Sequence, residues 1–208
     1  MTSGKFISVE GIDGCGKSTQ FLLIAKYILE KFKGNDIYLG VEPTRYFREI
    51  RNKLQIIKNV NDEADWFVKA FVEDRKHHVE KIIKLNLQNG THVLVDRYDL
   101  SSYAYQQAQG IQLEKIKQLH EGILIPDLTI IYYCDPQIAF RRRLRAGVTS
   151  LFDTNLEFQK LVQKFFLDLP KIFPERQIVL VDTDKGDHVQ EAVKLVFAET
   201  KRYLEKLF

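Results

Sequence analysis

A glycine-rich motif near the N-terminus constrains this chain more than any other feature. Residues 11–18 read Gly-Ile-Asp-Gly-Cys-Gly-Lys-Ser, which fits the spacing G-x-x-x-x-G-K-[ST] at every fixed position. An apolar run at 6–10 (FISVE) precedes the motif, and an apolar-rich helical stretch at 20–32 follows it. A strand, a glycine-rich loop and a helix in this order present backbone N–H groups and a helix N-terminus to phosphate oxygens. A chance match is the alternative, but it does not explain the flanking strand and helix. The sequence therefore predicts a nucleoside-triphosphate site.

Two side chains at the end of this motif have expected roles. Lys17 should reach the β- and γ-phosphates of ATP, and Ser18 Oγ should ligate Mg²⁺. The predicted ATP-binding segment is the whole loop and the first residues after it: Gly11, Ile12, Asp13, Gly14, Cys15, Gly16, Lys17, Ser18 and Thr19.

Five β-rich runs separated by helical stretches predict an α/β fold. Each run is almost continuously apolar, which is typical of strands buried on both faces of a parallel sheet. The intervening segments are long enough for crossover helices, so we expect a five-stranded parallel sheet with helices on both faces. The predicted strands are 6–10, 37–42, 92–97, 128–134 and 177–182. The 208 residues favour one domain over two, with a mobile loop at 147–157 that we expect to form part of a short lid at about 141–157.

Composition and charge exclude several other classes of protein. With 31 basic and 28 acidic residues the formal net charge is +3, which is too small to suggest a nucleic-acid partner. The sequence has no run of the ~20 apolar residues that a membrane span requires. Two cysteines are too few for a disulfide framework, and the first residues lack the apolar block of a signal peptide. We therefore expect a cytoplasmic protein with neither a membrane nor a nucleic acid as partner.

The residue after the third predicted strand favours a kinase over other proteins with this motif. A GTPase would need an Asn-Lys-x-Asp guanine reader, whereas Leu54 and Gln55 follow the only Asn-Lys pair. Motor ATPases usually carry an acidic residue after the strand-terminal aspartate, whereas here Arg97 follows Asp96. A cation at the carboxyl end of a strand lines the crevice of an open α/β sheet and suits a second phosphate. The alternative is an ordinary surface arginine.

The segment 64–88 holds a charged residue on an apolar face. At 100° per residue Arg75 is the only charged side chain inside the apolar arc, and Phe71 lies one turn before it on the same face. A charge on a buried stripe is costly unless it is paired or faces a polar cleft. An aromatic ring beside a guanidinium can stack on a nucleobase and hydrogen-bond to it. A structural ion pair to Arg75, with Phe71 as core packing, is the alternative.

Several blocks in a fixed order resemble the thymidylate kinase family of P-loop kinases. They are GIDGCGKSTQ at 11–20, Glu42-Pro43-Thr44, Phe71-x-x-x-Arg75, DRYDLSSYAYQ at 96–106 and Pro126-Asp127-Leu128-Thr129. The resemblance implies a P-loop kinase fold and a homodimer that transfers the γ-phosphoryl group of ATP to dTMP with Mg²⁺. Related kinases acting on dUMP or on a deoxynucleoside remain open, as does a regulatory module that only binds ATP.

The resemblance also implies roles for individual residues around the acceptor. Phe71 would stack on thymine, and Arg75 would approach a base carbonyl. Ser102 and Gln106 match positions that contact the base, and the ring of Tyr105 would crowd the 2′ position of the sugar. The block at 42–44 implies Glu42 as a further substrate-binding residue.

The resemblance places other residues near the phosphates. Arg97 would clamp the phosphate of dTMP, and Asp13 would accept from the 3′-hydroxyl or organise the acceptor phosphate. Asp96 would hold Mg²⁺ through water. Arg51 matches a phosphate-contacting arginine, but the segment after Glu42 is about two residues shorter than usual, so Arg48 competes for that role.

The lid is expected to supply a catalytic cation. Position 14 is glycine where one branch of the family has an arginine, so we expect the catalytic cation to come from the lid. Arg142 and Arg145 are three residues apart and share a helix face, so they are the predicted lid arginines, with Arg141 and Arg143 as the other candidates. A solvated basic face or a nucleic-acid patch is the alternative.

Overall fold

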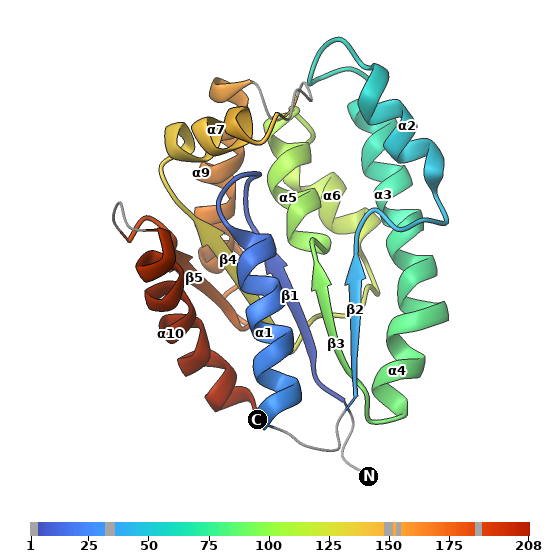
Figure 1. Ribbon diagram of the computed structural model, residues 1–208. Coiled ribbons are helices and arrows are strands. Elements are labelled where there is room, and N and C mark those ends of the chain that lie inside the picture. The colour runs from blue at the N-terminus through green and yellow to red at the C-terminus, as the bar shows by residue number, and fades with distance from the viewer. Residues whose placement is uncertain (1–3, 32–35, 148–151, 153–154, 186–188) are drawn as a thin grey trace.

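A computed structural model describes residues 4–31, 36–147, 152, 155–185 and 189–208. Five parallel strands form one sheet in the order β2-β3-β1-β4-β5 (Figure 1). The strands are β1 (Phe6–Glu10), β2 (Ile37–Val41), β3 (His92–Asp96), β4 (Leu128–Tyr133) and β5 (Ile178–Asp182). The predicted five-stranded parallel sheet is therefore confirmed, with strand ends that differ from the expected ones by at most one residue.

Helices connect the strands. They are α1 (Lys17–Lys31), α2 (Arg48–Ile56), α3 (Ala64–His78), the π-helical turn η1 (Val79–Ile83), α4 (Lys84–Gln88), α5 (Asp99–Ala108), α6 (Leu113–Leu119), α7 (Pro136–Arg145), α9 (Leu156–Ile172) and α10 (Val189–Leu207). The predicted helix at 64–88 is thus α3, η1 and α4 in succession. Most of the predicted lid loop, at 148–151 and 153–154, lies outside the described residues.

Helices cover both faces of the sheet, as expected. In Figure 1, α1 and α10 lie on one face, and α5 and α9 lie on the other. Residues of β1, β3 and β4 are almost all buried, which agrees with their continuous apolar sequences. The outer strands β2 and β5 are partly exposed because each has a neighbour on only one side.

A buried ion pair joins two distant parts of the chain. Arg176, just before β5, donates from Nη1 and Nη2 to the two carboxylate oxygens of Asp99 at 2.7 and 3.0 Å. Both side chains are only 5% exposed. Burial opposes ionisation of Asp99, but the charge of Arg176 outweighs it and lowers the pKa of that carboxyl. The pair fixes the start of α5, which carries several pocket residues.

Removal of one partner of this pair should destabilise the fold. We expect Arg176→Met to lower the free energy of unfolding by about 3 kcal/mol, because Asp99 is left as an unpaired buried charge. Urea denaturation followed by circular dichroism measures the change. The control is Arg202→Met at an exposed position of α10, where we expect a change within about 0.5 kcal/mol. Equal effects at the two positions would contradict the structural role of the pair.

A helix that spans a membrane must be both long and apolar. In the described parts of the chain, no helix combines the length and the apolar character that crossing a bilayer requires.

Candidate functional site

The site lies at the carboxyl edge of the sheet, where β1 and β3 end side by side. Val9 of β1 is in register with Asp96 of β3. The glycine-rich loop follows β1, and Arg97 follows β3 directly. The backbone N–H of Arg97 donates to Val9 O at 2.9 Å. The parallel arrangement therefore brings residues about 85 positions apart to one edge.

Two glycines of the loop are required by close backbone contacts. Gly11 has a φ of +130°, and a Cβ there would lie 2.1 Å from Tyr132 O of β4. Gly14 has a φ of +85°, and a Cβ there would lie 2.4 Å from Ala139 O of α7. No other residue type fits either position without a shift of the backbone. The loop is thus pressed between the end of β4 and the first turn of α7.

The lysine of the motif folds back onto its own loop. Lys17 Nζ donates to Ile12 O at 3.0 Å and lies 3.7 Å from Asp13 Oδ1. Ser18 and Thr19 are exposed in the first turn of α1. Cys15 is buried in the loop, and burial raises the pKa of its thiol, so this residue fills space and is not a reactive thiolate.

Arg97 points toward the glycine-rich loop. Its Nη2 lies 2.7 Å from Asp13 Oδ1 and donates to Tyr105 Oη at 3.2 Å. Its guanidinium carbon lies 5.1 Å from the centroid of the Tyr105 ring. Burial opposes ionisation of Asp13, but the charges of Arg97 and Lys17 hold the pKa of its carboxyl well below the usual range. The orientation agrees with the expectation that Arg97 faces the site.

A pocket of about 490 Å³ opens beside this ion pair. All residues predicted to bind the acceptor line it, together with both aspartates predicted to lie near the phosphates: Asp13, Glu42, Arg51, Phe71, Arg75, Asp96, Arg97, Ser102, Tyr105 and Gln106. The lining residues come from the glycine-rich loop, α2, α3, α5, α7 and the segments at the ends of β2 and β3.

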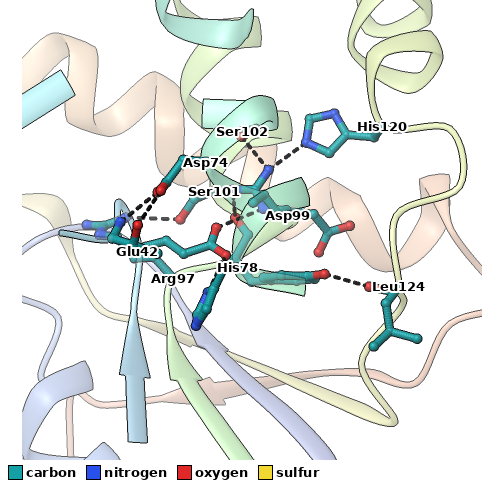
Figure 2. Close-up of polar contacts among 12 residues, drawn as sticks. Glu42, Asp74, His78, Arg97, Asp99, Ser101, Ser102, His120 and Leu124 are labelled. Atoms are coloured by element: carbon teal, nitrogen blue, oxygen red, sulfur yellow. Dashed lines mark hydrogen bonds and ion pairs between the residues drawn. The ribbon is translucent and has the colours of Figure 1, made fainter. Parts of the chain in front are cut away.

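Arg75 is both a pocket residue and a buried ion-pair partner. It is 2% exposed, and its Nε donates to Glu42 Oε2 at 2.8 Å. Its Nη1 donates to Ser102 Oγ at 3.1 Å and to His120 Nε2 at 2.7 Å (Figure 2). Tyr98 O accepts from Nη2 at 2.9 Å. The structural ion pair considered as an alternative therefore exists, and it holds the guanidinium at the pocket wall.

The segment after β2 is anchored to α3. Glu42, 4% exposed, accepts from Arg75 and lies 3.0 Å from His78 Nδ1. Asp74 accepts from both the backbone N–H and the hydroxyl of Thr44 (Figure 2). Glu42 thus serves the pocket mainly by fixing Arg75.

The structure separates the two candidate arginines of α2. Arg51 lines the pocket, and its Nη2 donates to Pro43 O at 2.5 Å. Arg48 is the first residue of α2 and is exposed. Of the two, Arg51 is therefore the one placed to contact a ligand.

The arginines of α7 are placed differently from the expectation. Within the described part of the predicted lid, Arg143 is the arginine that lines the pocket, and Arg142 and Arg145 are exposed. Arg142 Nη1 lies 3.4 Å from Gly14 O of the glycine-rich loop. Spacing alone identifies residues that share a helix face, but it does not show which face meets the pocket.

A family model described as thymidylate kinase matches residues 9–193. The chain belongs to the thymidylate kinase family. It is 36% identical to a probable thymidylate kinase of Thermococcus gammatolerans over 94% of this chain and 97% of the relative. It is 36% identical to a thymidylate kinase of Caldanaerobacter subterraneus subsp. tengcongensis over 97% of each chain. The crystal structure of thymidylate kinase from Ehrlichia chaffeensis superposes with a TM-score of 0.77 at 29% identity, covering 97% of this chain and 99% of that one.

A kinase family that uses ATP implies a bound Mg²⁺ ion, and the residues at the end of β3 and the start of α1 could hold it. Asp96 Oδ1 is buried and has no hydrogen-bond partner among the described residues, so this oxygen is available to a hydrated cation. Ser18 is exposed at the start of α1. The described residues contain no cluster of three or more His, Cys, Asp or Glu side chains suited to a metal. Mg²⁺ does not need such a cluster of side chains, because it keeps several water ligands and takes nucleotide phosphates as the others.

Sequence reasoning missed several residues of this thymidylate kinase site. Phe67, Gln109 and Phe152 line the pocket, and His120 holds Arg75 from behind it. Phe67 lies one turn before Phe71 on α3, with ring centroids 5.9 Å apart, so helical periodicity could have identified it. His120 gave no signal in the sequence, because its contact with Arg75 depends on how α6 packs on α3.

His120 should make the protein sensitive to acid. Burial and then the charge of Arg75 lower its pKa to about 4. A histidine with a lowered pKa stabilises the fold above its unfolded pKa of about 6.5, and this contribution is lost as pH falls toward 4. Wild type and His120→Gln, which retains an acceptor for Arg75, are compared at pH 7 and pH 4.5. The unfolding free energy should fall between these pH values by about 2 kcal/mol less in the variant than in wild type. Urea titrations at the two pH values test this, and equal losses would contradict it.

Proposed function

We propose that this thymidylate kinase phosphorylates dTMP to dTDP with ATP and Mg²⁺, for the biosynthesis of dTTP. One observation carries the residue assignment. The Arg97 guanidinium lies 2.7 Å from Asp13 of the glycine-rich loop, so a second cation stands directly beside the phosphate-binding loop. The glycine-rich loop and Arg97 could each bind a phosphate group at this edge of the sheet, as the transfer of a phosphoryl group between two nucleotides requires.

The reaction breaks one P–O bond and forms another. An oxygen of the dTMP phosphate attacks the γ-phosphorus of ATP, the bond to the β–γ bridging oxygen breaks, and ADP leaves with that electron pair. This transfer depends on positioning and charge neutralisation more than on a strong base. Bound Mg²⁺ supplies part of that neutralisation, and we assign Ser18 as its ligand and Asp96 as a partner through water.

The chain's own residues orient the two substrates. The loop N–H groups from Gly11 to Lys17 hold the phosphates of ATP, and Lys17 leaves Ile12 O to contact the β- and γ-phosphates. Arg97 releases Asp13 and binds the acceptor phosphate. It thereby holds the attacking oxygen in line with the bond that breaks. Arg51 lies at the same pocket and adds positive charge.

The other end of the pocket suits the nucleoside. Phe71 offers a ring face to the base, and Arg75 is fixed by Glu42 where it can donate to a base carbonyl. Ser102 and Gln106 lie on α5 beside them. Tyr105 stands between Arg97 and this end, where its ring limits the space at the 2′ position of the sugar.

We also propose the wider setting of the enzyme. It acts in the cytoplasm as a homodimer, without nucleic acid or membrane as partner, and residues 1–208 form one kinase domain with a lid at about 141–157. Light scattering behind size exclusion tests the dimer, because a mass near 24.3 kDa would indicate a monomer.

Loss of either phosphate-binding cation should abolish most of the activity. We expect Lys17→Ala and Arg97→Ala each to lower kcat/KM for dTMP by about 10³, because each removes charge stabilisation from the transferring or accepting phosphate. A coupled ADP assay with dTMP, dUMP, dCMP and thymidine as acceptors measures it. The control Lys26→Ala changes an exposed lysine of α1.

The acceptor panel also separates the alternatives. A preference for thymidine over dTMP would indicate a nucleoside kinase, and a preference for dUMP another monophosphate kinase. Tight ATP binding without turnover of any acceptor would indicate a regulatory module. Turnover of dTMP within a few-fold of wild type in both variants would contradict the mechanism.

The arginines of α7 can be ranked by the same assay. We propose that Arg143 joins the predicted pair Arg142 and Arg145 in neutralising charge, because Arg143 already lines the pocket. We expect kcat to fall most in Arg143→Ala, by about 10² or more, and least in Arg145→Ala. The largest loss in Arg145→Ala would instead restore the assignment made from helical spacing.

A further inference from the structure

Glu10 is a buried carboxyl group with no part in the mechanism above. It is the last residue of β1 and is 0% exposed. Its Oε1 accepts from the backbone N–H of Tyr98 at 2.8 Å, and its Oε2 accepts from the hydroxyl of Ser101 at 2.6 Å. Both donors belong to the turn and the helix that follow Arg97. The side chain therefore lies directly beneath the segment that carries the acceptor-phosphate cation.

Ser101 connects Glu10 to Arg97. The Ser101 Oγ also accepts from Arg97 Nη1 at 3.1 Å (Figure 2). A hydroxyl has one hydrogen, so a hydroxyl that donates to Glu10 presents only lone pairs to the guanidinium. By accepting the hydroxyl hydrogen, Glu10 makes the Ser101 oxygen an acceptor for Arg97 Nη1. This bond holds the guanidinium through Nη1, whereas Nη2 is the nitrogen that contacts Asp13.

The backbone at Arg97 needs an additional restraint. Its φ is +65°, in the left-handed region that a residue with a long side chain rarely adopts. Such a conformation persists where the surroundings over-determine it. The hydrogen bond from the Tyr98 N–H to Glu10 follows this residue directly, and the Arg97 N–H to Val9 O bond precedes it. The two bonds fix both sides of the strained residue.

A carboxylate at this place lowers stability at neutral pH. Four charged groups face Glu10: Arg97 after β3, Asp99 at the start of α5, Arg75 of α3 and Arg176 before β5. Burial dominates and raises the pKa of Glu10 from 4.5 to about 7. Its contribution to stability is therefore present below about 4.5 and is lost as pH rises through about 7. A costly buried carboxyl group beside a strained residue is typical of a functional position.

We propose that Glu10 is a positioning residue that orients the Arg97 guanidinium toward the acceptor phosphate, acting through the Ser101 hydroxyl and the Tyr98 N–H. This inference rests on the proposed function, in which Arg97 binds the phosphate of dTMP. Glu10 touches neither substrate, so its effect is specific to the phosphate end of the acceptor.

The test compares ligands with and without that phosphate. Affinities of dTMP and thymidine are measured by titration calorimetry at pH 8 for wild type and Glu10→Gln. The amide of the variant donates to Ser101 where the carboxylate accepted, so the hydroxyl hydrogen is turned toward Arg97. We expect the affinity for dTMP to fall about tenfold and the affinity for thymidine to stay within twofold. The melting temperature should not fall, because the variant removes a buried charge.

Two further variants complete the design. Ser8→Ala, two residues earlier on β1, loses a buried hydroxyl bond to Thr129 of 2.8 Å and should leave both affinities unchanged. In an Arg97→Ala background, Glu10→Gln should cause no further loss of dTMP affinity. If Glu10→Gln does not fold, Ser101→Ala removes the same connection and should show the same selective loss of dTMP affinity.

Each outcome decides the proposal. An unchanged ratio of dTMP to thymidine affinity in the variant would overturn it. Equal losses for both ligands, or a further loss in the Arg97→Ala background, would reduce Glu10 to a structural residue. If wild type itself binds thymidine as tightly as dTMP, the assignment of Arg97 to the phosphate fails, and this result is distinct because no variant is involved.

Discussion

The ion pair between Arg97 and Asp13 is the contact on which the rest of the site depends. It joins the ends of two adjacent parallel strands, and it places a cation of the pocket against the glycine-rich loop. Each of the two partly buried charges is the partner of the other. In the proposed mechanism, the acceptor phosphate replaces the Asp13 carboxylate as the partner of Arg97.

Buried ion pairs lie in and behind the pocket wall. Arg75, Asp99 and Arg176 are all nearly inaccessible, and each has an oppositely charged partner. Such pairs add little net stability compared with apolar residues of the same size. They hold donors in fixed directions, however, and Arg75 is held in this way at the pocket wall. Glu10, at the strand end beneath Arg97, is held instead by two neutral donors, the Tyr98 N–H and the Ser101 hydroxyl.

Local patterns in the sequence predicted the sheet, the phosphate loop, Arg75 and Arg97, whereas most other pocket residues were expected only from the resemblance to the thymidylate kinase family. Continuous apolar runs identified the strands, and the charge of Arg75 inside an apolar arc identified a wall residue. The choice between Arg142, Arg143 and Arg145 depended on how α7 is rotated against the loop, which no spacing contains. The contacts of His120 and Glu10 also escaped, because both are made across the fold by residues distant in sequence.

The close approach of Gly14 to Ala139 has a mechanical consequence. The phosphate loop and the first turn of α7 touch backbone to backbone, with no flexible side chain between them to absorb a displacement. The positions of the two segments are therefore mechanically coupled. A displacement of the glycine-rich loop toward α7 thus requires a matching displacement of the helix that carries Arg142 and Arg143.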